Sequence, residues 1–133
     1  MIRCISLVLL VCVGFFNTPS LAKDYDVIVY GATASGVMAS IAAADEGMAV
    51  LLVEPGNYVG GMVTGGLSHT DYGDKTVIGG LAYEFYKKVA KHYKTHIFNW
   101  RGPEPHVGEK IMKDWLEESG VEVIYGKRVE KKL

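Results

Sequence analysis

The feature that most constrains the fold is a strand–helix–strand pattern near the start of the chain. Asp26–Tyr30 (DVIVY) is a short apolar run that ends directly at Gly31, and Ala34–Glu46 shows helical periodicity with many small residues. Gly47 follows where this helix would end, and Ala49–Val53 (AVLLV) is a second apolar run. Continuous apolar runs are typical of parallel strands that are buried on both faces. This order, within about thirty residues, predicts one βαβ unit of an α/β domain.

A glycine turn and an acidic residue indicate what this unit binds. The turn reads Gly31-Ala32-Thr33-Ala34-Ser35-Gly36, and Glu54 directly follows the second apolar run. Gly31 would permit the tight turn, Gly36 would let the helix pack closely on the sheet, and the amides at the helix start would face a pyrophosphate. Glu54 is placed to accept hydrogen bonds from a ribose diol, and its charge would repel the 2′-phosphate of NADP. We predict a Rossmann-type dinucleotide site; the alternative is an α/β domain whose glycines serve only its turns.

The chain beyond Glu54 predicts a loop, two helices and a third strand. Residues 55–80 are rich in glycine without a sustained period, which is typical of a functional loop. Apolar residues recur at helical spacing in Leu81–Tyr93 and again in His106–Ser119, and Val121–Tyr125 (VEVIY) is a third apolar run. We expect residues 23–133 to form a three-stranded parallel sheet with helices, with the glycine-rich loop and a helical insertion at about residues 55–104. Doubly wound domains normally have more strands, so the sheet is expected to be incomplete and the chain to be an N-terminal fragment.

The first 22 residues have the pattern of a signal peptide. Arg3 gives a weak positive start, Ile5–Phe16 is almost unbrokenly apolar, and small residues stand at Ser20 and Ala22. The apolar run is shorter than the roughly twenty residues that a membrane-spanning helix needs. We expect cleavage after Ala22 and a secreted or periplasmic protein exported by the Sec-type route, with no membrane attachment after cleavage; the alternative is an uncleaved anchor. Both cysteines lie in this segment, so the mature chain would have no disulfide.

The net charge and the spacing of the histidines limit which binding partners the sequence predicts. The formal net charge is −1 and acidic and basic residues alternate, so nothing predicts a nucleic-acid partner. His92 and His96 have i, i+4 spacing, but no third ligand is evident and no metal is expected. His69 and Asp71 lie two residues apart in the glycine-rich loop, where they could act as a proton relay or bind substrate. The alternative is that Asp71 caps a turn and His69 is a solvent-facing loop residue. The catalytic residues and the small-molecule substrate stay unassigned.

The motifs resemble a known family of secreted FAD-dependent oxidoreductases, the xanthan-lyase-like group. The resemblance covers essentially the whole mature chain, and a small residue or threonine is common there at the position of Thr33, where the usual motif has a second glycine. Its most specific part is the stretch from Gly60 to Asp71. The segments that carry it are Tyr30–Gly36, Val53–Gly56, Gly60–Leu67, Asp71, Gly79–Leu81, Glu84–Tyr86 and Glu104–Val107.

The resemblance implies a glutathione-reductase-like FAD-binding domain and assigns roles to thirteen residues. One group would bind the pyrophosphate, and a second would follow the dinucleotide toward its ribityl and flavin end. Glu54 would bind the adenosine ribose, and Val129 matches the place where backbone groups bind adenine. The first group is Gly31, Thr33, Ala34, Ser35 and Gly36; the second is Gly60, Gly61, Met62, Thr64 and Gly65, with Gly66 beside them.

The function expected on these grounds is that of an FAD-dependent oxidoreductase. The flavin would transfer hydride or electrons, while the protein binds and orients it. As a fragment, this chain alone is expected to be inactive. Two alternatives remain at this stage: a truncated, non-catalytic remnant or nucleotide-binding piece, and an NAD-linked dehydrogenase, which the glycine pair after Glu54 disfavours.

Overall fold

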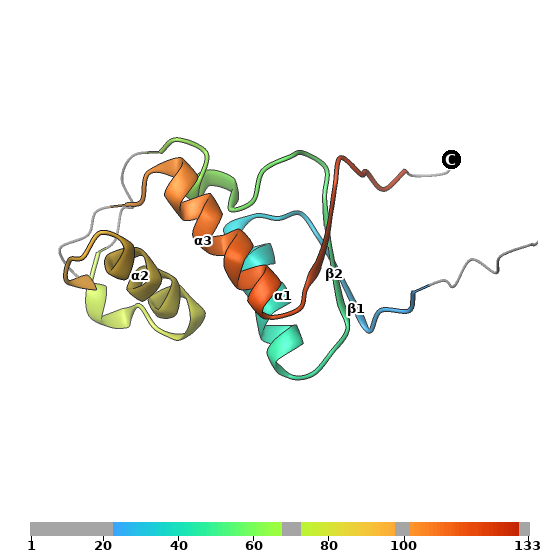
Figure 1. Ribbon diagram of the computed structural model, residues 1–133, viewed down its shortest axis with the longest axis horizontal. Coiled ribbons are helices and arrows are strands. Elements are labelled where there is room, and N and C mark those ends of the chain that lie inside the picture. The colour runs from blue at the N-terminus through green and yellow to red at the C-terminus, as the bar shows by residue number, and fades with distance from the viewer. Residues whose placement is uncertain (1–22, 68–72, 98–101, 131–133) are drawn as a thin grey trace, which may run out of the picture.

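The computed structural model describes residues 23–67, 73–97 and 102–130, which form one α/β unit (Figure 1). Its sheet has three parallel strands in the order β1-β2-β3, with β1 at Val27–Tyr30, β2 at Val50–Glu54 and β3 at Glu122–Tyr125. Val27 pairs with Val50 and Leu51 pairs with Glu122. The predicted α/β fold with a three-stranded parallel sheet is thus confirmed.

Three long helices lie on the same side of the strands in Figure 1. They are α1 at Ala34–Asp45, α2 at Gly80–His92 and α3 at Pro105–Glu118. Helix α1 contacts β1 and β2, and α3 contacts both α1 and α2. The loop between β2 and α2 contains two short 3-10 helices, η1 at Gly61–Val63 and η2 at Lys75–Val77. The connection between β2 and β3 therefore places two helices next to the βαβ unit.

The core lies between one face of the sheet and the helices. Strand residues that share a face alternate along the chain. Apolar side chains on the covered face pack with fully buried residues of α1, α2, α3 and the loop after β2. The strand residues are Val27, Val29, Val50, Leu52, Val123 and Tyr125, and the most deeply buried of the others are Val37, Ile41, Val59, Val89, Met112 and Leu116.

The opposite face of the sheet is open along β1, although a continuous apolar run is typical of a strand that is buried on both faces. Ile28 is 64% exposed and Tyr30 is 52% exposed, whereas Val27 and Val29 between them pack on the core. No element among the described residues covers this face of β1, so the apolar run is continuous in sequence but only alternately buried. Among the described residues, no helix is both long enough and apolar enough to cross a membrane.

Each predicted element is present, with small shifts at its ends. All three strands begin one residue later than expected, and β2 also includes Glu54. Such one-residue differences are ordinary because helix and strand ends depend on local capping. Helix α3 buries Val107, Met112 and Leu116, whereas Ile111 and Trp115 are only half-buried.

Candidate cofactor site at the carboxyl ends of β1 and β2

The turn between β1 and α1 is held by close backbone contacts. Gly31 has a φ of +98°, a value that favours glycine, and its amide donates to the carbonyl of Val53 over 2.7 Å. A Cβ atom on Gly36 would lie 2.0 Å from the carbonyl oxygen of Gly31. This distance is far below van der Waals contact with a backbone atom. The start of α1 can therefore approach the end of β1 this closely only if position 36 is glycine.

Two hydroxyl groups fix the peptide groups of Gly36. Thr33 is the N-cap of α1, and its Oγ1 accepts a hydrogen bond from the Gly36 amide over 3.1 Å. The Thr33 Oγ1 also lies 3.0 Å from the Ser35 Oγ. Ser40 is fully buried, and its hydroxyl donates to the Gly36 carbonyl over 2.9 Å. Sequence reasoning missed Ser40; its only signal was a polar residue on the apolar side of a helix.

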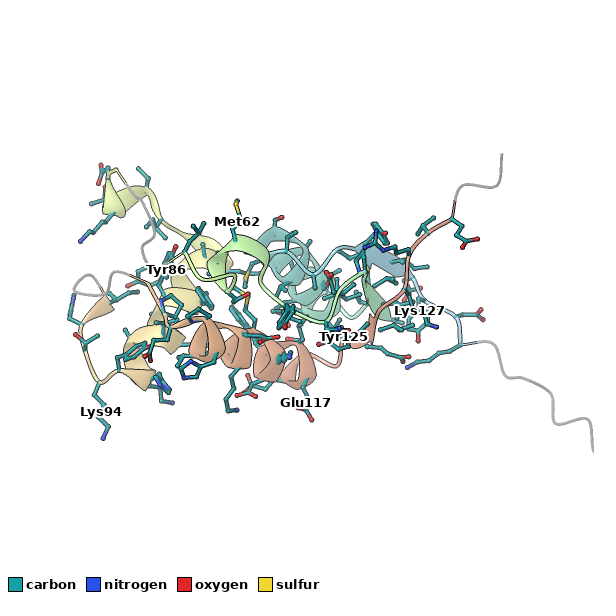
Figure 2. All side chains as sticks on the ribbon, turned by 90° about the horizontal axis from the view of Figure 1, so that it is seen from above. Met62, Tyr86, Lys94, Glu117, Tyr125 and Lys127 are labelled. Atoms are coloured by element: carbon teal, nitrogen blue, oxygen red, sulfur yellow. The ribbon has the colours of Figure 1, made fainter. Side chains whose placement is uncertain are left out.

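The carboxylate of Glu54 binds this turn to the end of β2. Its Oε2 accepts from the amide of Ala32 and its Oε1 from the amide of Gly56, both over 2.6 Å. The Glu54 backbone carbonyl accepts from the amide of Lys127 over 3.3 Å, which continues the β3 side of the sheet. Three separate segments of the chain therefore meet at Glu54. Figure 2 shows Lys127 and Tyr125 at this end of the molecule.

The glycine pair after β2 lies directly beside the first turn. Gly60 donates its amide to the Ala32 carbonyl over 2.7 Å and forms a parallel bridge with Thr33. A Cβ atom on Gly61 would lie 3.3 Å from the Thr33 Cα, and one on Gly60 would lie 2.9 Å from the Met112 sulfur. A side chain at either position would therefore crowd neighbouring atoms of the protein itself.

The same loop is anchored to α3. Glu109 Oε1 accepts from the amide of Val59 over 3.3 Å and forms an ion pair with Lys113 over 2.7 Å. This hydrogen bond with Glu109 raises the pKa of the Lys113 ammonium group. Gly108 of α3 lies against Pro103, since a Cβ there would be 2.9 Å from the proline ring. The insertion after β2 therefore positions the glycine pair.

The structure brings together only part of the predicted site residues. Gly31–Gly36, Glu54, Gly60 and Gly61 lie close to one another. Thr64 also lies beside Gly60, since a Cβ atom on Gly60 would be 2.3 Å from the Thr64 Cγ2. Thr64 donates its hydroxyl to the Val59 carbonyl over 2.5 Å, and Gly65 lies against the carbonyl of Gly61.

Met62 and Val129 are both solvent-exposed. Met62 is 77% exposed and points away from the helices in Figure 2. Val129 is 75% exposed on the segment after β3. His69 and Asp71 lie outside the described residues. Helix α2 ends at His92, so His96 is not on its face, and no group of three metal-ligating side chains occurs among the described residues.

An apolar pocket of about 230 Å³ opens next to the first turn of α1. Ala34 and Ser35 form its edge on the side of the candidate site. The other lining residues come from α1, η1, α2 and α3, and include Met38, Val63, Phe85 and Tyr86. Sequence reasoning missed this pocket because its walls come from segments far apart in the chain.

Several solved structures are similar to the fold of this chain. The structure of AlpK matches with a TM-score of 0.50 and 19% identity, over 77% of this chain and 24% of AlpK. THI4 from Thermovibrio ammonificans matches with a TM-score of 0.49 and 15% identity, over 77% of this chain and 38% of THI4. OTEMO in complex with FAD and NADP matches with a TM-score of 0.46 and 19% identity, over 79% of this chain and 19% of OTEMO. The chain thus spans well under half the length of these structures.

Fold and site together define a Rossmann-type α/β domain with a glycine turn at the end of its first strand. A family model described as "FAD dependent oxidoreductase" matches residues 26–132. The chain belongs to the FAD-dependent oxidoreductase family, and FAD is the cofactor expected from the sequence and supported by this match. A search of curated proteins found no match.

Proposed function

We propose that this chain binds the ADP part of FAD in an exported oxidoreductase that acts on a small-molecule substrate. Bound FAD supplies hydride or electron transfer, and the residues described here bind and orient it. The observation that carries the proposal is the hydrogen bond from the Ala32 amide to the Glu54 carboxylate. It fixes a glycine turn suited to phosphate and an acid suited to a ribose in one rigid arrangement.

The residues present fit an ADP group. The glycine at position 36 lets the start of α1 lie against the end of β1. The first amides of a helix have no hydrogen-bond partner within the helix and attract phosphate. Glu54 uses one acceptor position on each carboxylate oxygen for a backbone amide. A carboxylate offers about four such positions, so two stay open to ribose hydroxyl groups. The same negative charge disfavours a 2′-phosphate.

The roles of the remaining residues follow from the family resemblance. Gly60, Gly61, Met62, Thr64 and Gly65 would follow the dinucleotide beyond its pyrophosphate, and Val129 would lie near adenine. Gly60 and Gly61 are the members of this group that lie beside the glycine turn. We propose no catalytic residue.

Nucleotide titration of the whole chain tests the binding proposal. We expect FAD to bind and ADP to displace it, because both carry the part that the glycine turn and Glu54 would recognise. FMN lacks the adenosine half and is expected to bind far more weakly. Flavin fluorescence and equilibrium dialysis measure these affinities. Equal affinity for FMN and FAD, or a failure of ADP to compete, would contradict the proposal, and a preference for NAD over FAD would favour a nicotinamide-linked dehydrogenase.

We also propose that residues 1–22 are a signal peptide that is removed on export. Small residues at Ser20 and Ala22 suit a signal peptidase. The Lys23 side chain forms an ion pair with Glu122 at the start of β3, which is compatible with cleavage just before it. Intact-mass measurement of the exported protein is expected to give a chain that starts at Lys23. A mass that retains residues 1–22 would contradict cleavage.

A further inference from the structure

Thr33 occupies a position where its side chain competes with a phosphate group. Its Oγ1 accepts the Gly36 amide over 3.1 Å, which is one of the amides that a pyrophosphate at the start of α1 would use. We propose that the Thr33 hydroxyl takes the place of a phosphate oxygen in the free protein and must leave this amide when the cofactor binds. This inference rests on the proposed function, since it concerns the same site.

The backbone of Thr33 is fixed, so the exchange has to occur in the side chain. Thr33 forms the bridge with Gly60, and its carbonyl accepts from the Val37 amide over 2.9 Å. Gly61 lies against its Cα on the other side. Moving the turn would break all these contacts, whereas rotation about χ1 only takes the hydroxyl from one staggered position to another.

The released hydroxyl has other partners within reach. In the capping rotamer its Oγ1 also lies 3.0 Å from the hydroxyl of Ser35. Thr33 is exposed, so water can satisfy the hydroxyl after rotation. An interaction that is present only in the free protein stabilises that state. Its free energy is lost when the ligand binds, so the apparent affinity for the ligand is lower by the corresponding factor. Thr33 thus stabilises the free protein while it weakens phosphate binding.

The test compares Thr33→Ala with Thr33→Ser in the whole chain. We expect Thr33→Ala to lower the melting temperature of the free protein, because α1 loses its N-cap. The same variant is expected to bind ADP and FAD more tightly, by about two- to tenfold in Kd, the size of one net hydrogen bond. Thr33→Ser keeps the hydroxyl and should leave both quantities close to those of the unchanged protein. Adenosine, which has no phosphate, should bind the unchanged chain and Thr33→Ala equally.

The opposite direction of the two effects distinguishes this role from a purely structural one. If Thr33→Ala weakens or does not change the binding of ADP and FAD, the competition is overturned while the FAD site itself stands. If Thr33→Ala also tightens adenosine binding to the same extent, the effect is not due to phosphate and the inference is equally overturned. If the unchanged chain binds neither ADP nor FAD, the proposed function fails and the inference fails with it.

Discussion

The substitution Gly36→Ala is expected to abolish FAD binding and to destabilise the fold. A Cβ atom at this position would lie 2.0 Å from the Gly31 carbonyl oxygen, and neither partner is a flexible side chain. Helix α1 would have to move away from β1 and take the amides of its first turn with it. Overpacking typically costs about 1–3 kcal/mol of unfolding free energy, and this contact with the backbone belongs at the upper end. Thermal unfolding and flavin titration measure the two effects.

Gly73→Ala is the matched control for this experiment. Gly73 lies in the loop before η2, its φ is not in the left-handed region, and a Cβ atom there would meet nothing within 4 Å. Its replacement should leave the melting temperature and FAD affinity almost unchanged. A Gly36→Ala variant that melts and binds FAD like the Gly73→Ala control would show that α1 tolerates the displacement.

Glu54→Ala is expected to weaken both the fold and cofactor binding. The variant leaves the amides of Ala32 and Gly56 without the acceptor that now binds each of them over 2.6 Å. A hydrogen bond to a charged group contributes about 1.5–3 kcal/mol, and partial exposure reduces this value here. We therefore expect a loss of about 2 kcal/mol in unfolding free energy. Loss of the ribose contact should cost about 1.5–3 kcal/mol in FAD binding.

Two further variants separate the causes of this effect. Glu54→Gln keeps the shape and one oxygen acceptor, so its melting temperature should lie between those of Glu54→Ala and the unchanged chain. Because glutamine is uncharged, this variant should also discriminate less strongly between ADP and 2′-phosphorylated ADP. Glu117→Ala is the control, because Glu117 points into solvent from α3 (Figure 2). If Glu54→Ala behaves like Glu117→Ala in both measurements, Glu54 neither supports the turn nor binds the ribose.

The βαβ unit was predictable because its signals are local. Asp26–Tyr30 and Ala49–Val53 were recognisable as apolar runs bounded by glycine and acidic residues, and both strands were located to within one residue. The apolar runs alone did not identify which residues of β1 lie on its uncovered face. Burial depends on which other segments pack against a strand, and an apolar residue such as Ile28 has the same sequence signature on either face.

Part of the candidate site could not be predicted because it depends on distant contacts. The pattern around Gly60 and Gly61 suggested that these glycines approach the cofactor. Their Cα atoms also face Thr33 and the sulfur of Met112, and no local pattern encodes that pairing. Ser40 was missed for a different reason. Its hydroxyl donates to the carbonyl of Gly36 four residues earlier in the same helix, which is a local contact that a single serine in an apolar helix does not announce.

The central position of β2 has a consequence for chain entropy. Its pairing with β1 joins Val27 to Val50, which closes a short loop, whereas its pairing with β3 joins Leu51 to Glu122. Closing the second loop, which is roughly three times as long, costs about 1 kcal/mol more in loop entropy. The glycine turn lies inside the short loop. The part of the sheet that carries the candidate phosphate site is therefore the part whose closure costs less.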